Sequence, residues 1–312
     1  MCAGARSRRI WPPLQRRSGG GPRHPVATLT DMKEGGDPAD LTATASVALN
    51  RIGAPPGRVH ARTIAGRALV AAPGFAFAKC YADPAPLINE AAAMQMVANA
   101  GLPAPAILLF EPGPPAILVR SWVGGDPLTG GEAQLRRVGR MLSQMHRIPI
   151  APPLTSPLIP WGEMVLRWSR EYAGQAQRRG LISERHADQV HSYFESMLPA
   201  LRSRPITLTH GDLKPVHVLM DDAGEIAGVL DFADAGGRDP AWDLASLTEL
   251  HPAWEPTLVS AYGDPDIAGM IAGYRLQQAL GVAVWLAQHD RLDMAHAAAE
   301  RVVRVLEYEI RR

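Results

Sequence analysis

The stretch that most constrains the fold of this chain is 207–219, with the sequence TLTHGDLKPVHVL. It begins with alternating apolar and β-branched residues and breaks at Gly211. It then places Asp212, Lys214 and His217 before an apolar run. Apolar runs bounded by turn residues predict buried strands, and the polar residues between them predict a loop. We therefore expect a strand, a loop that carries these three side chains, and a second strand.

A second acid closes the next apolar run. Asp231 follows the sequence IAGVL at 226–230, and the turn residues Asp-Ala-Gly occupy 222–224. Two apolar runs joined by such a turn predict a β-hairpin. The hairpin would bring Asp212 and Asp231 to the same end of the sheet, where two carboxylates can share one metal ion.

Three motifs occur in order along the chain. They are His210-Gly211-Asp212-Leu213, then Asp231-Phe232, then DPAWDLA at 239–245. In this order they resemble the aminoglycoside phosphotransferase family, a kinase-like group that includes the choline kinase-like proteins. The resemblance implies an α+β, two-lobed, protein-kinase-like fold. Its small N-terminal lobe would be mainly β with one long helix, and its larger C-terminal lobe mainly helical.

The resemblance also implies an activity. It implies a small-molecule kinase that transfers the γ-phosphate of ATP or GTP, with Mg²⁺, to a hydroxyl group of an antibiotic or a related metabolite. Asp212 is the expected base that orients the attacking hydroxyl, and Asp231 is the expected main magnesium ligand. The alternatives left open are a nucleotide-binding module without catalysis and a kinase of sugars or amino alcohols. A protein kinase is disfavoured because the chain has Asp-Phe-Ala at 231–233 instead of Asp-Phe-Gly.

Two further loop residues have open assignments. The family usually has an asparagine five positions after the base, and this chain has His217 there. The macrolide phosphotransferases look similar in the His-Val-Leu that follows, so His217 is expected to contact the metal or a phosphate. The alternative is a histidine that only hydrogen-bonds the loop. Lys214 is expected to balance charge on the transferred phosphate, and the alternative is an exposed loop lysine.

Structural roles are expected for three other residues. A buried His210 beside the carboxylate of Asp243 would lock the loop through charge-assisted hydrogen bonds. His146 lies near the end of a predicted helix, where we expect it to cap or pack.

The N-terminal half predicts a small lobe with its own lysine. Lys79 lies inside an apolar strand, and Glu90 lies in the first turns of the following helix. The resemblance implies that Lys79 holds nucleotide phosphates and pairs with Glu90. The alternative is an outward-facing lysine of a half-exposed strand. Gly66 is the only glycine of the expected phosphate loop, so the contacts that cover the phosphates stay unassigned. The predicted strands are 59–64, 68–72, 75–81 and 106–110, and the predicted helix is 86–100.

A hinge is expected after the next strand, 116–119. The sequence RSWVGGDP at 120–127 would join the lobes, and the main chain of Ser121, Trp122 and Val123 would read the purine edge. Trp122 has the alternative of packing under the linker.

The expected domains follow from this hinge. Residues 28–119 form the nucleotide-binding lobe and residues 128–312 the catalytic and acceptor-binding lobe. Residues 1–27 are basic, contain no Glu and no Asp, and lack an apolar core of a signal peptide, which predicts a disordered tail, with a nucleic-acid-binding arm as the alternative. The helices predicted in the larger lobe are 131–147, 161–178, 183–201 and 294–310, with Ser183 as a helix cap.

Composition limits the partners. A formal net charge of +1 gives no strong excess for nucleic acid or a membrane surface. The two cysteines, Cys2 and Cys80, are too few for a disulfide framework and favour a reducing compartment. We therefore expect a cytoplasmic protein, a monomer or weak dimer, whose partner is a small hydroxyl-bearing molecule and neither nucleic acid nor membrane.

Overall fold

The structure is a computed structural model that describes residues 38–55, 60–64, 66–154 and 159–309. The contacts divide the chain at residues 33 and 34, and every described residue belongs to the second unit, Glu34–Arg312. The tail predicted at 1–27 lies outside the described residues.

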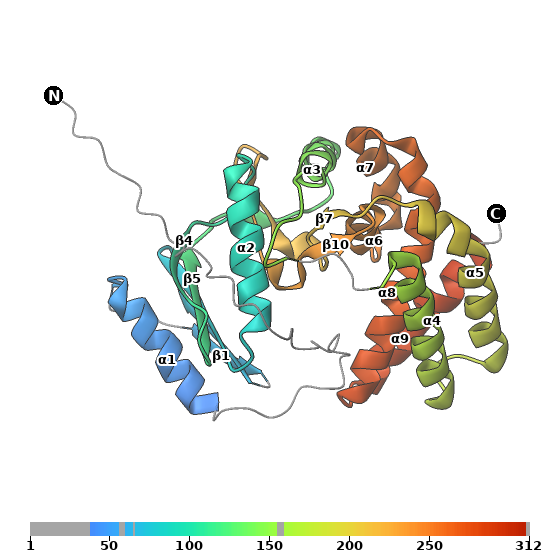
Figure 1. The fold of residues 1–312 in the computed structure, drawn as a ribbon, viewed down its shortest axis with the longest axis horizontal. Helices are drawn as coiled ribbons and strands as arrows, with labels where there is room; N and C mark the ends of the chain where they lie inside the picture. The colour runs from blue at the N-terminus through green and yellow to red at the C-terminus, as the bar shows by residue number, and fades with distance from the viewer. Residues whose placement is uncertain (1–37, 56–59, 65, 155–158, 310–312) are drawn as a thin grey trace, which may run out of the picture. The chain divides into compact units, whose positions relative to one another are not determined.

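A five-stranded antiparallel sheet with the order β1-β2-β3-β5-β4 forms the small lobe. Helices α1 (Pro38–Arg51) and α2 (Ala85–Asn99) cover its two faces (Figure 1). Because side chains alternate between the faces of a strand, each face has its own core. The α1 face is built from small residues such as Ala78 and Cys80, and the α2 face from larger ones such as Tyr81. The strands are β1 (His60–Ile64), β2 (Arg67–Ala72), β3 (Ala76–Tyr81), β4 (Ile107–Glu111) and β5 (Ala116–Ser121).

The predicted hairpin is confirmed. Strand β8 (Val218–Met220) pairs antiparallel with β9 (Ile226–Val229), and the short β6 (Asp126–Pro127) pairs with β8 on its other side. Gly125 precedes β6 with a φ of 121°, and a Cβ there would lie 2.4 Å from the Met220 carbonyl oxygen. Only glycine allows the chain to cross β8 this closely.

Strand β7 has a different partner. β7 (Thr207–Thr209) pairs antiparallel with β10 (Gly236–Arg238), which follows the hairpin in the chain. The loop after β7 therefore lies between two paired segments, which fixes both of its ends.

The remaining described residues of the larger lobe are mainly helical. Ser183 caps α5 as predicted, because its hydroxyl accepts a hydrogen bond from the His186 N–H. The helix predicted at 294–310 begins earlier, and its α-helical part ends at Arg304, where the π-helical segment η5 (Val305–Glu309) takes over. The helices are α3 (Glu132–Met145), α4 (Trp161–Arg178), α5 (Glu184–Ser203), α6 (Ala241–Thr248), α7 (Glu255–Tyr262), α8 (Ala268–Gln288) and α9 (Leu292–Arg304), and the short 3₁₀ turns are η1 (Pro215–His217), η2 (Phe232–Asp234), η3 (Pro252–Trp254) and η4 (Pro265–Ile267).

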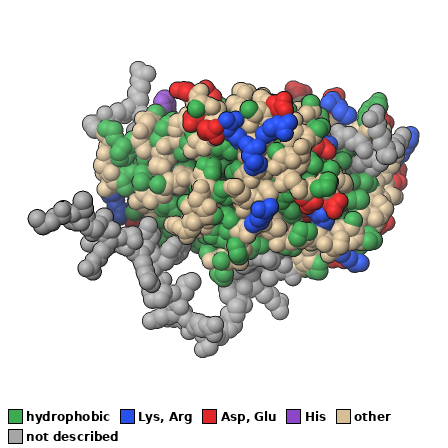
Figure 2. Space-filling view, turned by 90° about the horizontal axis from the view of Figure 1, so that it is seen from above, with side chains coloured by type: hydrophobic (Ala, Val, Ile, Leu, Met, Phe, Trp, Pro, Cys, Tyr) green, Lys and Arg blue, Asp and Glu red, His purple; other side chains and the backbone are tan. Residues whose placement is uncertain are grey.

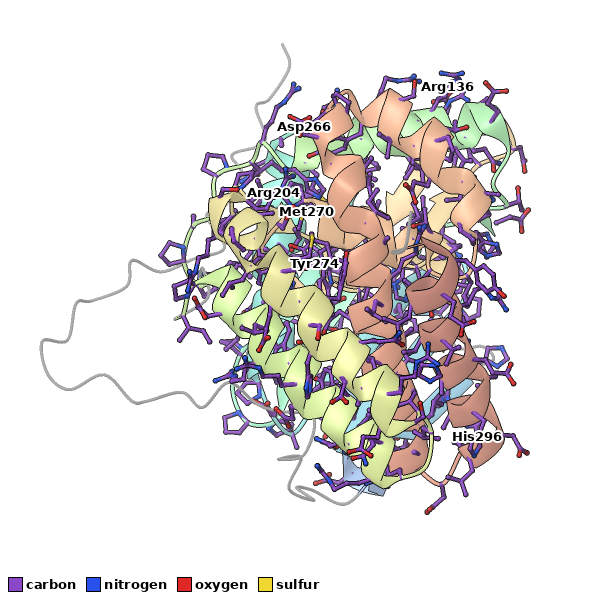
Figure 3. The ribbon with its side chains drawn as sticks, turned by 90° about the vertical axis from the view of Figure 1, so that its right-hand side faces the viewer. Arg136, Arg204, Asp266, Met270, Tyr274 and His296 are labelled. Carbon is purple, nitrogen blue, oxygen red and sulfur yellow. The ribbon has the colours of Figure 1, made fainter. Side chains whose placement is uncertain are left out.

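One buried acid joins the helices to β10. Asp239 accepts hydrogen bonds from Arg204 Nε and from the Tyr274 hydroxyl, both at 2.9 Å. Figure 3 shows Arg204, after α5, close to Tyr274 of α8. The Asp239 carboxylate also accepts from the Ala241 N–H at the start of α6. A buried charge needs such partners, so this acid fixes α6 against α8.

None of the described helices combines the length and apolar character that a membrane-spanning segment requires. The face in Figure 2 carries basic and acidic side chains beside one another, in keeping with the low net charge.

Candidate active site

The loop after β7 is held by its first residues. His210 is fully buried, donates from Nε2 to the Leu230 carbonyl oxygen at 2.8 Å, and contacts the Phe232 ring. Gly211 has a φ of 87°, and a Cβ on it would lie 2.1 Å from the Asp234 carbonyl oxygen. These contacts fix the loop against the segment that follows β9, so the hairpin and the loop form one unit.

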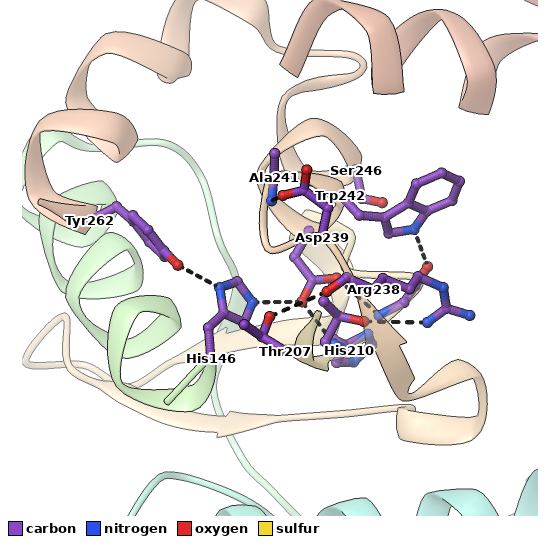
Figure 4. Close-up of polar contacts among 12 residues, drawn as sticks. His146, Thr207, His210, Arg238, Asp239, Ala241, Trp242, Ser246 and Tyr262 are labelled. Atoms are coloured by element: carbon purple, nitrogen blue, oxygen red, sulfur yellow. Dashed lines mark hydrogen bonds and ion pairs between the residues drawn. The ribbon is translucent and has the colours of Figure 1, made fainter. Parts of the chain in front are cut away.

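Asp243 of α6 holds the backbone of this loop. Its buried carboxylate accepts hydrogen bonds from the N–H groups of His210 at 2.7 Å and Gly211 at 2.9 Å. The sequence suggests the ring of His210 as its histidine partner, but that partner is His146, whose Nε2 lies 3.1 Å away. His146 also contacts the Tyr262 hydroxyl through Nδ1 at 3.0 Å (Figure 4). Burial by itself raises the pKa of Asp243, but the hydrogen bond from His146 and the nearby donors outweigh it and lower that pKa.

The loop presents two charged side chains to solvent. The Asp212 carboxylate is 39% exposed and the Lys214 ammonium side chain 52% exposed, and the two groups are 2.8 Å apart. His217 Nδ1 lies 2.8 Å from the Asp212 carbonyl oxygen. Because a carbonyl can only accept, Nδ1 carries a hydrogen, and the neutral ring has its lone pair on Nε2.

Asp231 lies at the end of the hairpin in a strained conformation. Its φ is 68°, in the left-handed region that non-glycine residues rarely adopt. One carboxylate oxygen lies 2.6 Å from Lys79 Nζ, and the other lies 3.8 Å from His217 Nε2. Burial by itself raises the pKa of Asp231, but Lys79 outweighs it, and the pKa falls to about 2.

The predicted pair of Lys79 and Glu90 is confirmed. Lys79 Nζ lies 2.7 Å from Glu90 Oε2, and both side chains are buried. Burial by itself lowers the pKa of Lys79, but Glu90, Tyr81 and Asp231 raise it above its usual value. Burial raises the pKa of Glu90, and Lys79 offsets part of that rise. Lys79 thus joins α2 of the small lobe to the acid at the end of β9.

The three predicted hinge residues differ in whether their backbone N–H groups make hydrogen bonds. The N–H of Ser121 donates to the Ala106 carbonyl, and that of Trp122 donates to the Phe75 carbonyl. Across the described residues, the N–H of Val123 makes no hydrogen bond. The Trp122 side chain is 39% exposed, so it does not lie packed under the linker. Of the three predicted hinge residues, Val123 is the one with an unused N–H.

Sequence reasoning missed one residue beside these groups. Arg120, between Val119 and Ser121, is 8% exposed, and its guanidinium carbon lies 4.7 Å from the centre of the Phe77 ring. The available signal is a charged residue two positions after Leu118 in an otherwise apolar strand. That spacing puts both side chains on one face of β5.

The potential metal ligands at and near Asp231 fit a magnesium ion that binds together with a nucleotide. No group of three or more His, Cys, Asp or Glu side chains among the described residues could hold a metal ion on its own. Magnesium retains several waters and takes one or two protein ligands besides substrate phosphates. Asp231 Oδ2 lies 3.8 Å from His217 Nε2, and when the imidazole is neutral both atoms are acceptors, an arrangement that a cation between them would satisfy.

Together these features define a class of protein. A buried lysine held between a helix glutamate and an acid after a β-hairpin, with a second acid on a neighbouring loop, is the arrangement of a kinase-like phosphotransferase. The model of the phosphotransferase enzyme family (APH) matches residues 76–279, more than half of the chain. The chain belongs to this family, and the predicted phosphotransferase activity is confirmed at that level.

Solved structures share the fold. The GDP complex of aminoglycoside 2'-phosphotransferase-IIIa is 16% identical with a TM-score of 0.70, over 86% of this chain and 99% of that one. A choline/ethanolamine kinase family protein from Mesorhizobium loti is 20% identical with a TM-score of 0.61, over 83% and 92%. Macrolide 2'-phosphotransferase MphH from Brachybacterium faecium is 18% identical with a TM-score of 0.60, over 85% and 98%. The predicted two-lobed, kinase-like fold is therefore confirmed.

A curated relative matches a shorter region. The uncharacterized protein YcbJ of Bacillus subtilis (strain 168) is 29% identical over 92 residues. That region is 30% of this chain and 26% of YcbJ, so the match spans about a quarter of the relative's length.

Proposed function

We propose that this chain is a small-molecule kinase that transfers the γ-phosphate of a nucleoside triphosphate to a hydroxyl group of an antibiotic or a related metabolite. The observation that carries the proposal is the position of Lys79 Nζ, 2.7 Å from Glu90 and 2.6 Å from Asp231. A buried ammonium group held by two acids is placed to contact nucleotide phosphates beside a metal ligand.

We assign the nucleotide to the small lobe, with residues 28–119 as its binding lobe and 120–127 as the hinge. The free N–H of Val123 is the hinge group that would read the purine edge, because the Ser121 carbonyl already accepts a hydrogen bond from Arg120 Nη1 at 3.4 Å. The Val123 side chain packs against β9, since a Cβ on Gly228 would lie 2.9 Å from its Cγ1. Residues 128–312 would supply the catalytic loop and the acceptor site.

The charged side chains have separate roles in this proposal. Lys79 holds the phosphates, and Glu90 fixes its ammonium group. Asp231 and His217 would hold Mg²⁺, which when bound neutralises phosphate charge. Asp212 orients the acceptor hydroxyl and takes its proton as the hydroxyl oxygen bonds to the γ-phosphorus and the nucleoside diphosphate leaves. Lys214, now paired with Asp212, offsets negative charge on the transferred group.

The acceptor class is proposed from the family. The similar structures are named for aminoglycosides, macrolides and choline or ethanolamine, all compounds with hydroxyl groups. We propose that a cytoplasmic monomer or weak dimer acts on such a compound. The histidine at 217 favours macrolide-like or other antibiotic acceptors over amino alcohols.

The test is nucleotide consumption by the purified full-length chain over a panel of antibiotics, sugars and amino alcohols. We expect one acceptor class to stimulate turnover, and Asp212→Asn to remove most of that turnover without weakening nucleotide binding. Asp222→Asn, which changes an exposed acid in the turn between β8 and β9, is the matched control. Tight nucleotide binding with no consumption for any acceptor would instead favour a nucleotide-binding protein without catalysis.

A further inference from the structure

The inner end of the hinge carries a buried cation with no role in the proposed chemistry. Arg120 lies opposite Phe77 of β3 in the strand register, and Lys79 lies opposite Leu118. Opposed residues of an antiparallel pair share a face, and so do residues two apart. Arg120 is therefore on the same face of the sheet as Lys79, which is the face covered by α2.

The guanidinium group of Arg120 is short of acceptors. A guanidinium has five N–H donors. Over the described residues, its one hydrogen bond runs from Nη1 to the Ser121 carbonyl oxygen at 3.4 Å, and Nε is buried without a partner. Unpaired buried donors cost free energy. The site therefore favours a ligand that brings acceptors to this position.

Nearby groups keep the guanidinium charged and in place. Burial lowers the pKa of Arg120, and the acids Glu90 and Asp231 offset only part of that fall. An arginine in such surroundings stays protonated at neutral pH. The Phe77 ring contacts the guanidinium, which restricts where its donors can point.

Purine bases differ in what they would present to these donors. Guanine has two acceptors side by side, O6 and N7, whereas adenine has the acceptor N7 beside an amino group that donates. Arginine pairs with O6 and N7 through two parallel hydrogen bonds. An adenine amino group would instead face the guanidinium donor to donor, which leaves buried donors unpaired.

We propose that Arg120 makes this site selective for guanine nucleotides, by donating hydrogen bonds to O6 and N7 of the base. The inference rests on the proposed function, because it requires a purine bound between the hinge and Lys79. It adds the identity of the phosphate donor, which the sequence leaves open between ATP and GTP.

The first test compares nucleoside diphosphates by calorimetric titration of the full chain with Mg²⁺, which needs no acceptor. We expect GDP to bind at least about tenfold more tightly than ADP. IDP keeps O6 and N7 without the 2-amino group and should bind like GDP. The 2,6-diaminopurine diphosphate keeps a 6-amino group and should bind like ADP. Equal or tighter binding of ADP would overturn the proposal.

The second test uses variants. Arg120→Met keeps apolar bulk without donors, and we expect the GDP-to-ADP affinity ratio to fall toward one through loss of GDP affinity. Arg67→Met is the matched control, because Arg67 also lies over an aromatic ring of the sheet, 5.0 Å from the centre of Tyr81, and its removal should leave the ratio unchanged. An unchanged ratio in Arg120→Met would refute the role of Arg120. If that variant does not fold, the IDP and diaminopurine comparison in the unchanged chain decides.

Failure of the inference differs from failure of the proposed function. If GDP and ADP bind equally and Lys79→Met weakens both, the kinase proposal stands and guanine selection is wrong. If no purine nucleotide binds the unchanged chain, the proposed function is wrong and the inference falls with it.

Discussion

Two carboxylates twelve positions apart have opposite situations in this protein. Asp243 is fully buried and accepts hydrogen bonds from two backbone N–H groups of the loop and from His146. The Asp231 side chain is 43% exposed; one oxygen contacts Lys79, and within the described part of the chain the other has only His217 Nε2 at 3.8 Å. The first acid is satisfied by the protein. The second is held in place with an oxygen left for a ligand.

The comparison separates a carboxylate whose acceptors are used by the protein from one that keeps an acceptor free. Both acids have a lowered pKa, so the direction of the shift does not distinguish them. The difference lies in exposure and unfilled acceptors. Asp243 fixes the loop that carries Asp212, whereas Asp231 keeps a carboxylate oxygen that the protein does not fill, which is the feature that the proposed metal site requires.

The largest expected effect tests Asp231, the acid with an unfilled carboxylate oxygen. Asp231→Asn should lower turnover by about a thousandfold or more, equivalent to about 4 kcal/mol, because the charge available to a nucleotide-bound cation is lost. Stability should fall by only about 1 to 2 kcal/mol, because the partly exposed ion pair with Lys79 is lost while Lys79 keeps Glu90, and asparagine tolerates the left-handed conformation of this position. Steady-state kinetics and thermal unfolding measure the two effects, with Asp222→Asn as the control. A large fall in stability would mean that Asp231 is as structural as Asp243.

The next largest effect tests Asp243, the buried acid whose oxygens are hydrogen-bonded within the protein. Asp243→Asn should lower the free energy of unfolding by about 3 kcal/mol, because an amide donor would face the buried N–H groups that the carboxylate accepts from. Urea unfolding measures the loss. Asp293→Asn is the matched control, since Asp293 also lies in the first turn of a helix but is exposed. If both variants unfold alike, the buried network contributes no stability.

A smaller effect is expected in how the stability difference between the original chain and Asp243→Asn depends on pH. The pKa of Asp243 is lowered in the folded state, and the pKa of an unfolded aspartate is about 3.9. Its contribution is therefore fully present above the unfolded pKa and is lost as pH falls through the folded pKa. The difference in unfolding free energy between the original chain and Asp243→Asn should be constant near neutral pH and shrink below about pH 4. Urea titrations across that range measure it, and a difference that grows on acidification would contradict the assignment.

The smallest expected effect tests whether His217 contacts a metal ion beside Asp231. His217→Asn restores the residue usual in the family and should change turnover with Mg²⁺ by less than about tenfold, because an amide oxygen also suits magnesium. The softer imidazole should favour Mn²⁺, so the ratio of Mn²⁺- to Mg²⁺-supported turnover should fall in the variant. An unchanged ratio would leave His217 as a residue that only hydrogen-bonds the Asp212 carbonyl.

Much of the fold follows from local pattern. Helix α4 has the predicted bounds, and the β8–β9 hairpin lies where its apolar runs and turn residues predict it. The pairing of Lys79 with Glu90 follows from the resemblance and is present. The assignment of His146 as a capping or packing residue was incomplete, because its contacts with Asp243 and Tyr262 join residues about a hundred positions away.

The sequence alone predicted most of the helices and strands and the charged side chains of the catalytic loop and of Lys79 and Glu90, because periodicity, turn residues and motif spacing act over a few neighbouring positions. The tertiary structure decided that Asp243 is buried and fully hydrogen-bonded while Asp231 is partly exposed. Burial and hydrogen bonding depend on segments that meet only after folding. It also turned Arg120 from an unremarked hinge residue into a buried cation with unused donors. No local pattern contains that information, since the groups that bury this side chain come from other strands and from a helix.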